Sequence, residues 1–231
     1  MFSIRKRLLI AAAVTAAVIL LFSCCFSALA ASKSSPGYYT IVVDAGHGGI
    51  DPGVLGVNTK VKESHINLLI ARQLRQDFEN AGFNVVLTRE DEGGLYGLPT
   101  QGFKQRDMRR RKEIIEQARP AAMISIHQNN FLAQPSRRGG QVFYAAGKSE
   151  GKSLAEGIQK ELNALNEAEH SALTGDYYML NCTDYPSVIV ECGFLSNAQD
   201  ESLLLTEEYR DRLADAIFRG TLAWLASRAA L

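Results

Sequence analysis

The chain has 231 residues, of which 46% are hydrophobic and 22% are charged, an ordinary composition for a globular protein. Its 25 basic residues equal its 25 acidic residues, so the formal net charge is zero. The absence of a global positive field argues against nucleic-acid binding, and the length favours one domain with a sizeable core.

Residues 1–31 have the pattern of an export signal. A basic start with Arg5, Lys6 and Arg7 precedes an apolar run, and the segment 28–30 (ALA) fits the motif that signal peptidase cleaves. Two alternatives stay open: an uncleaved apolar run of about 20 residues can anchor a chain in a membrane, and 21–24 (LFSC) resembles a lipoprotein cleavage site. All three interpretations export the rest of the chain and limit membrane contact to this segment.

Two of the four cysteines lie in the leader, which leaves Cys182 and Cys192 in the mature chain. Export permits a disulfide between them. A pair of buried thiols is an equally open interpretation, because sequence spacing says little about the geometry that a disulfide requires.

Behind a polar linker at 32–38, apolar strands alternate with amphipathic helices. The strand pattern covers 39–44, 83–88, 121–126, 140–145 and 187–191. The helical pattern covers 63–81, 105–119, 153–165 and about 207–226, with a glycine-rich loop at 91–102. Connections too long for hairpins predict one α/β catalytic domain over 39–231, with a mostly parallel sheet of about five or six strands and helices on both faces.

Functional groups in such folds gather at the carboxyl ends of the strands. His47, His127 and Glu191 each lie at or just past the end of a predicted strand. Glu63 alone would be explained by the preference of carboxylates for helix N-termini, but Glu191 follows Val-Ile-Val, where an unpaired carboxylate is costly. Two imidazoles and a carboxylate at one edge match a catalytic zinc site with an open fourth position, and a second carboxylate can act as general base.

Other candidates fit this chemistry less well. His65 lies two residues from Glu63, roughly on the opposite helix face, and His170 lies in a polar segment without a flanking strand. The glycines of 46–53 do not match a dinucleotide fingerprint and no Walker lysine follows them. We expect these glycines to let the backbone bend tightly around a metal-bound substrate.

Four segments resemble the zinc-dependent N-acetylmuramoyl-L-alanine amidases of bacterial cell-wall hydrolysis, the amidase-3 family. They are 41-IVVDAGHGG-49, 63-ESHINLLIA-71, 125-SIHQN-129 and 188-VIVECGFLSN-197, which occur in family order within a resemblance spanning 39–227. The resemblance implies that His47, Glu63 and His127 bind Zn²⁺, that Glu191 is the catalytic carboxylate, and that Asn129 helps to shape the substrate site. It implies cleavage of the peptidoglycan amide bond between N-acetylmuramic acid and L-alanine.

The organisation of the chain indicates one subgroup within this family. A leader followed by a bare catalytic domain is similar to the germination-specific amidases of spore-forming bacteria, which implies a location in the cell wall or the forespore intermembrane space. The family often has Leu-x-x-Arg followed by Ala-Asn before its third strand, where this chain has Met108, Arg111, Ile115 and Glu116. We expect that helix to be structural.

Rival interpretations remain at the level of sequence. A zinc carboxypeptidase or deacetylase could use the same side chains, and a wall-binding module without activity would not need Glu191 as a base. A protein activator is compatible with each of them. The loop 91–105 and the basic run 109–112 could form its docking surface, although a solvated helix face also explains the basic run.

Overall fold

The computed structural model describes residues 39–166 and 169–229. The predicted leader at 1–31 and the linker at 32–38 lie outside these residues. None of the helices in the described part of the chain combines the length and the apolar character needed to cross a membrane.

Six strands form one sheet in the order β2-β1-β3-β6-β4-β5. All neighbouring strands are parallel except β4 and β6, which are antiparallel. The strands are β1 (Thr40–Ala45), β2 (Asn84–Leu87), β3 (Ala122–Asn129), β4 (Gln141–Tyr144), β5 (Leu173–Thr174) and β6 (Ser187–Phe194). The predicted mostly parallel α/β sheet is therefore confirmed.

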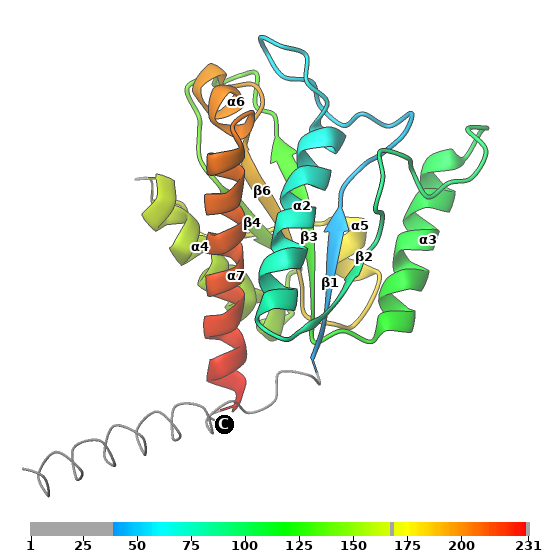
Figure 1. Cartoon of the computed structure of the whole chain (residues 1–231), viewed down its shortest axis with the longest axis vertical. Coiled ribbons are helices and arrows are strands. Elements are labelled where there is room, and N and C mark those ends of the chain that lie inside the picture. Colours follow the sequence, from blue (N-terminus) through cyan, green and yellow to red (C-terminus); the bar gives the residue numbers. More distant parts are fainter. Residues whose placement is uncertain (1–38, 167–168, 230–231) are drawn as a thin grey trace, which may run out of the picture. The chain divides into compact units, whose positions relative to one another are not determined.

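Helices pack on both faces of this sheet (Figure 1). The helices are α2 (Glu63–Asn80), α3 (Phe103–Ala118), α4 (Ser149–Asn166), α5 (Tyr178–Asn181), α6 (Ala198–Leu204) and α7 (Glu207–Ala229). Apolar residues of α2, α4 and α7 form the larger core cluster, whereas Ile115 of α3 and Met179 of α5 belong to a smaller one on the opposite face.

The alternating directions of strand side chains build these two cores. In β1, Ile41 and Val43 belong to the larger cluster and Val42 to the smaller one. Both sides of a central parallel strand are covered, so its sequence is a continuous apolar run rather than an alternation of polar and apolar residues.

The termini of α2 and α3 follow local sequence signals. Gly82, with a φ of 87°, comes directly after the α2 cap, and its N–H donates to the carbonyl of Glu79. This is the left-handed position that favours glycine after a helix. Helix α3 ends before Pro120, where Arg119 has a φ of 47°.

Several predicted boundaries differ from the structure. Helix α4 begins at Ser149, four residues before its predicted start, β2 and β4 are each one residue shorter at both ends, and tertiary pairing extends two strands. Strands β3 and β6 continue to Asn129 and Phe194, three residues past their predicted ends, because each finds a hydrogen-bonding partner in the other. The elements β5, α5 and α6 were not predicted. They have 2, 4 and 7 residues, too few for a periodic pattern.

Candidate metal centre and active site

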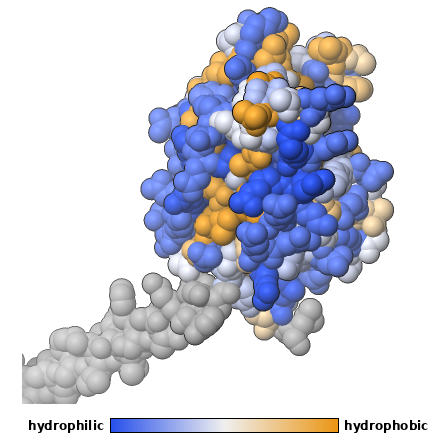
Figure 2. Space-filling view, turned by 90° about the vertical axis from the view of Figure 1, so that its right-hand side faces the viewer, coloured by the Kyte–Doolittle hydropathy of each residue, from blue (hydrophilic) through white to orange (hydrophobic). Residues whose placement is uncertain are grey.

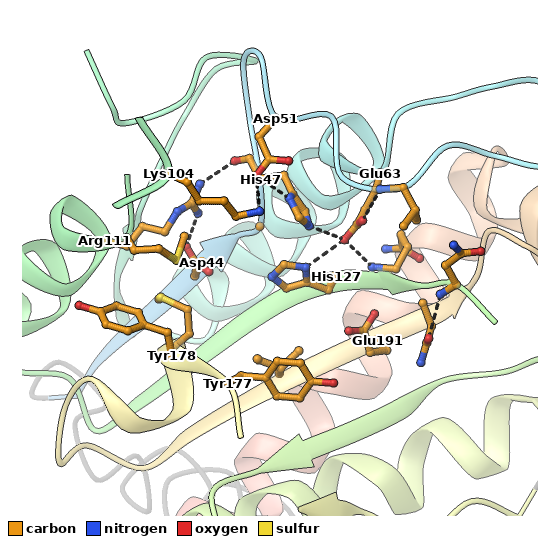
Figure 3. A pocket seen from close by; sticks show the side chains of 18 residues that line it. Asp44, His47, Asp51, Glu63, Lys104, Arg111, His127, Tyr177, Tyr178 and Glu191 are labelled. Atoms are coloured by element: carbon orange, nitrogen blue, oxygen red, sulfur yellow. Dashed lines mark hydrogen bonds and ion pairs between the residues drawn. The ribbon is translucent and has the colours of Figure 1, made fainter. Parts of the chain in front are cut away.

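The carboxyl ends of β1 and β3 meet the start of α2. His47 follows β1, His127 lies in β3, and Glu63 is the first residue of α2. One candidate ligand atom from each of these side chains lies within 4.8 Å of the other two. Glu63 Oε1 is 3.2 Å from His47 Nε2 and 2.9 Å from His127 Nδ1, an arrangement that Figure 3 shows.

Glu63 is held in this position by backbone donors. Its side chain is only 2% exposed, yet Oε2 accepts a 2.8 Å hydrogen bond from the Val54 N–H and Oε1 a 3.1 Å bond from the Gln128 N–H. Burial raises the pKa of Glu63, but the facing imidazoles of His47 and His127 lower it well below its ordinary value. The carboxylate is therefore ionised and aimed at both rings.

The glycines of the turn make room for the candidate ligands. A Cβ at Gly46 would lie 2.2 Å from His127 Cε1, and a Cβ at Gly53 would lie 2.3 Å from Glu63 Oε2. No side chain tolerates such distances, so the backbone can pass these groups only where Cβ is absent. The glycines therefore pack closely against the candidate ligand side chains, and their expected role beside a metal-bound substrate stays a prediction.

A buried arginine holds the turn that carries His47. Arg111 of α3 is fully buried and forms ion pairs with Asp44 and Asp107, each at 2.6 Å. Its Nη1 donates to the carbonyl of Ala45 and its Nη2 to that of His47, at 2.8 and 2.6 Å. His47 adopts a left-handed φ of 61°, which side chains other than glycine rarely adopt. We infer that these hydrogen bonds stabilise that conformation.

A second arginine, Arg89, donates hydrogen bonds to the same turn. It is 3% exposed, and its guanidinium donates to the carbonyls of Ala45, Gly46 and Ser64 at 2.9, 3.1 and 2.6 Å. The turn after β1 is thereby tied to the first helical turn of α2. Neither arginine was a candidate in the sequence analysis. Arg89 follows the apolar pattern of β2, which marks it as a charge that needs partners, whereas Arg111 lies in a basic run that gives no sign of burial.

The outer nitrogen of the His47 ring faces a carboxylate. Its Nδ1 lies 3.0 Å from Asp51 Oδ2, which in turn lies 3.1 Å from Lys104 Nζ. Burial lowers the pKa of His47, but the hydrogen bonds with Asp51 and Glu63 raise it to about 9. A carboxylate on the far nitrogen fixes the orientation of an imidazole whose other nitrogen binds a metal.

We expect Asp51→Asn to weaken metal binding by about 10- to 100-fold, because the amide orients the His47 ring less strongly than the carboxylate does. Zinc titration in competition with a chelating dye measures this change. Asp91→Asn is a matched control, since Asp91 caps the neighbouring loop through the Gly93 N–H and does not contact His47. Equal zinc affinities in the two variants would exclude the orienting role.

Glu191 lies beside His127 in the register of β3 and β6. Its Oε2 is buried and has no hydrogen-bond partner among the described residues. Burial is the main cause that raises the pKa of Glu191 to about 7. A carboxyl group in this condition can both take up and release a proton near neutral pH.

A cavity of about 490 Å³ opens onto these groups. Glu191, His127 and Asn129 line it, together with the partly exposed rings of Tyr177 and Tyr178 (Figure 3). The cavity is therefore lined in one part by polar and titratable side chains and in another by aromatic and apolar ones, a combination typical of ligand sites. The two tyrosines come from the unpredicted α5 region and had no motif to identify them.

The remaining histidines and cysteines lie elsewhere. His65 faces Glu92 at 2.7 Å on the surface, and His170 Nε2 lies 2.9 Å from the Arg138 carbonyl, so neither joins the cluster. Cys182 and Cys192 are free thiols, and Cys192 is fully buried. No disulfide joins the two, and the buried-thiol alternative holds for Cys192, whereas Cys182 is half-buried.

The chemistry of the cluster suits a divalent metal. Two imidazole nitrogens and a carboxylate oxygen converge, and the carboxylate is ionised. Without a metal, His47 has to be protonated to donate to both Asp51 and Glu63, because each of its two ring nitrogens faces one of these carboxylates. The donor set is one that zinc binds in catalytic sites.

Comparisons with known proteins agree with this geometry. Residues 41–223 match the family model described as N-acetylmuramoyl-L-alanine amidase, Amidase_3. The germination-specific N-acetylmuramoyl-L-alanine amidase of Bacillus subtilis is 34% identical over 198 residues, which are 81% of this chain and 80% of that protein. The N-acetylmuramoyl-L-alanine amidase LytC of the same species is 32% identical, over 80% of this chain and 35% of its own length.

Solved structures give the same family. The CwlD amidase of Clostridioides difficile, solved in complex with the GerS lipoprotein, has a TM-score of 0.78 and 38% identity, covering 82% of this chain and 99% of that one. The catalytic domain of the amidase CwlV from Bacillus (Paenibacillus) polymyxa has a TM-score of 0.71 and 27% identity, covering 81% and 98%. The chain belongs to the amidase-3 family of N-acetylmuramoyl-L-alanine amidases, which hydrolyse peptidoglycan.

Proposed function

We propose that the reaction of this amidase depends on a Zn²⁺ ion bound by His47, Glu63 and His127, with Glu191 as the general base and acid. The observation that carries the proposal is the convergence of three candidate ligand atoms within 4.8 Å, next to a buried carboxylate oxygen of Glu191 that has no hydrogen-bond partner in the described part of the chain. Zinc bound there supplies a Lewis acid and lowers the pKa of water toward about 7.

The protein's own side chains transfer the proton and bind the substrate. Glu191 accepts a proton from the water that attacks the lactyl carbonyl of N-acetylmuramic acid. It returns this proton to the nitrogen of L-alanine as the C–N bond breaks, because an amide anion is a poor leaving group. The products are a lactyl carboxylate on the glycan and a free amine on the stem peptide. Asn129 lines the cavity and contributes to the substrate site.

Metal removal and product analysis test the proposal together. We expect one zinc per purified chain, loss of activity on chelation, and recovery on adding Zn²⁺. Mass spectrometry of digested peptidoglycan should show intact stem peptides with new L-alanine amines. Zinc in the protein with release of terminal D-alanine would indicate a carboxypeptidase, release of acetate a deacetylase, and wall binding without released amines an inactive module.

The biological setting is also part of the proposal. The germination-specific relative of Bacillus subtilis supports a role in spore cortex modification or germination. The cell-wall substrate of the family supports an extracytoplasmic location, and we propose that residues 1–31 direct export. The CwlD amidase was solved with a lipoprotein, which supports a protein partner for this chain as well.

A further inference from the structure

The active-site cavity continues over the start of α3. A second hollow of about 520 Å³ shares Lys104, Met108 and Tyr178 with the lining of the first one. Its other lining residues include Arg109 and Lys112 of α3. Figure 3 shows Lys104 and Tyr178 on the side of the cavity away from Glu191. A groove therefore leads from the candidate metal centre to the outer surface of α3.

This groove carries positive charge in a protein of zero net charge. Helix α3 has six basic and three acidic residues, and the face of the molecule that carries it is largely hydrophilic (Figure 2). Arg111 is buried, and Arg106 donates to carbonyls of the preceding loop, such as that of Tyr96. The basic side chains that line the groove are therefore Lys104, Arg109 and Lys112.

The three cations differ in how far they are neutralised. Lys104 is paired with Asp51 at 3.1 Å, and Lys112 faces Glu116 at 3.5 Å. Arg109 is exposed, and none of the ion pairs found among the described residues involves it. An unpaired guanidinium above a groove offers a planar set of donors that matches a carboxylate.

The two arms of the substrate differ in charge. The muramic acid carboxyl is consumed in the amide bond, so the glycan arm is uncharged, whereas the stem peptide carries free carboxylates. The cavity lining on the side of β3 offers the neutral amides of Asn129 and Asn130, and the α3 side offers cations. Charge complementarity therefore assigns opposite sides to the two arms.

We propose that the groove over α3, lined by Lys104, Arg109, Lys112 and Tyr178, binds the anionic stem peptide and orients the substrate across the metal centre. The proposal rests on the amidase function proposed above. Its contacts are exposed to solvent, so each one contributes modestly and acts on substrate binding rather than on the chemical step.

Steady-state kinetics with two soluble muropeptides tests this subsite. One substrate has free stem carboxylates, and in the other the same carboxylates are amidated. We expect Arg109→Gln to raise KM for the free-carboxylate substrate by about 2- to 5-fold with kcat unchanged. KM for the amidated substrate should not change. The effect should vanish at about 1 M salt, where the Debye length is only about 3 Å.

Arg110→Gln is the matched control. Arg110 is the next residue, is also exposed, lies outside both hollows and pairs with Glu113 at 3.1 Å. Arg110→Gln removes the same charge from the same helix as Arg109→Gln does. Equal KM changes in the two variants would show that the charge acts through its long-range field rather than by contact, and would overturn the proposed subsite. Lys112→Gln should behave like Arg109→Gln.

Other outcomes separate the possible errors. Unchanged KM values for both substrates in Arg109→Gln and Lys112→Gln would reject the groove as a peptide site while leaving the amidase function intact. Charge-dependent loss of binding to phosphatidylglycerol vesicles with unchanged KM would assign the face to an anionic membrane surface instead. Failure of the wild-type protein to release L-alanine amines from either substrate would reject the proposed function itself.

Discussion

Glu191→Gln should lower turnover of peptidoglycan by about 100- to 10,000-fold while the protein keeps its zinc. The glutamine has nearly the same shape, but it cannot accept a proton from water or return one to the leaving amine. The position lies in the register pair with His127 and lines the cavity. We therefore expect loss of proton transfer with little change in substrate binding, seen as a lower kcat at similar KM.

His127→Ala is the informative companion to this variant. It removes a candidate ligand, so zinc content and turnover should both be lost, whereas Glu191→Gln should lose turnover alone. Metal analysis, thermal melting and release of L-alanine amines measure the three properties in each variant. Turnover near the wild-type rate in Glu191→Gln would assign proton transfer to another group.

Arg111→Met should lower the free energy of unfolding at neutral pH by about 3–5 kcal/mol. The methionine fills much of the space, but it leaves two carboxylates, Asp44 and Asp107, without their buried cation. It also removes the donors to the carbonyls of Ala45 and His47. The turn that carries His47 should lose order, so we expect weaker zinc binding in addition to lower stability.

The stability loss in Arg111→Met should depend on pH. In the wild type, burial raises the pKa of Asp44, but the Arg111 guanidinium and the hydroxyls of Ser125 and Thr88 lower it, with a result of about 2. This value lies below that of an unfolded aspartate, so the ionised Asp44 stabilises the wild type above about pH 4, and the contribution disappears as pH falls toward 2.

In the variant the sign of the shift reverses. Without Arg111, burial dominates and raises the pKa of Asp44, so that protonation relieves the buried charge. The difference in unfolding free energy between wild type and variant should therefore be largest at pH 7 and shrink toward pH 4. Urea denaturation across this range measures it. Arg110→Met, which changes an exposed arginine of the same helix, should stay within about 0.5 kcal/mol of the wild type at every pH.

The mostly parallel sheet with helices on both faces was predictable because its strands and helices follow from local patterns, whereas the strand order was not predicted. The five predicted strands are apolar runs flanked by turn residues, and α2 carries apolar residues at helical spacing with Gly82 behind it. The continuation of β3 to Asn129 and of β6 to Phe194 was not predictable in the same way. The end of β3 is polar and the end of β6 contains Gly193, so neither continues an apolar strand pattern, and the pairing between the two strands extends them.

Some residues of the site were likewise predictable from local patterns, and others were not. A carboxylate at the end of Val-Ile-Val identified Glu191, and the glycine turn identified His47. Asp44 carries the same signal, an acidic residue that ends an apolar run, but its partner Arg111 is 67 residues away, which no local pattern reveals. Tyr177 and Tyr178 stand at the start of a short element, α5, that packs against β6 and α3.

The sequence by itself determined the class of fold, the family, and the residue types that carry the chemistry, because hydrophobic periodicity and the four family segments are local properties of the chain. The tertiary structure decided which charges are shared and which are free. Arg111 and Arg89 hold the backbone of the His47 turn, Glu63 Oε1 faces both imidazoles, and Arg109 lacks an ion pair among the described residues. These differences arise because a buried charge needs a partner nearby in space. Such partners come from distant segments of the chain, which are brought together only when the sheet assembles.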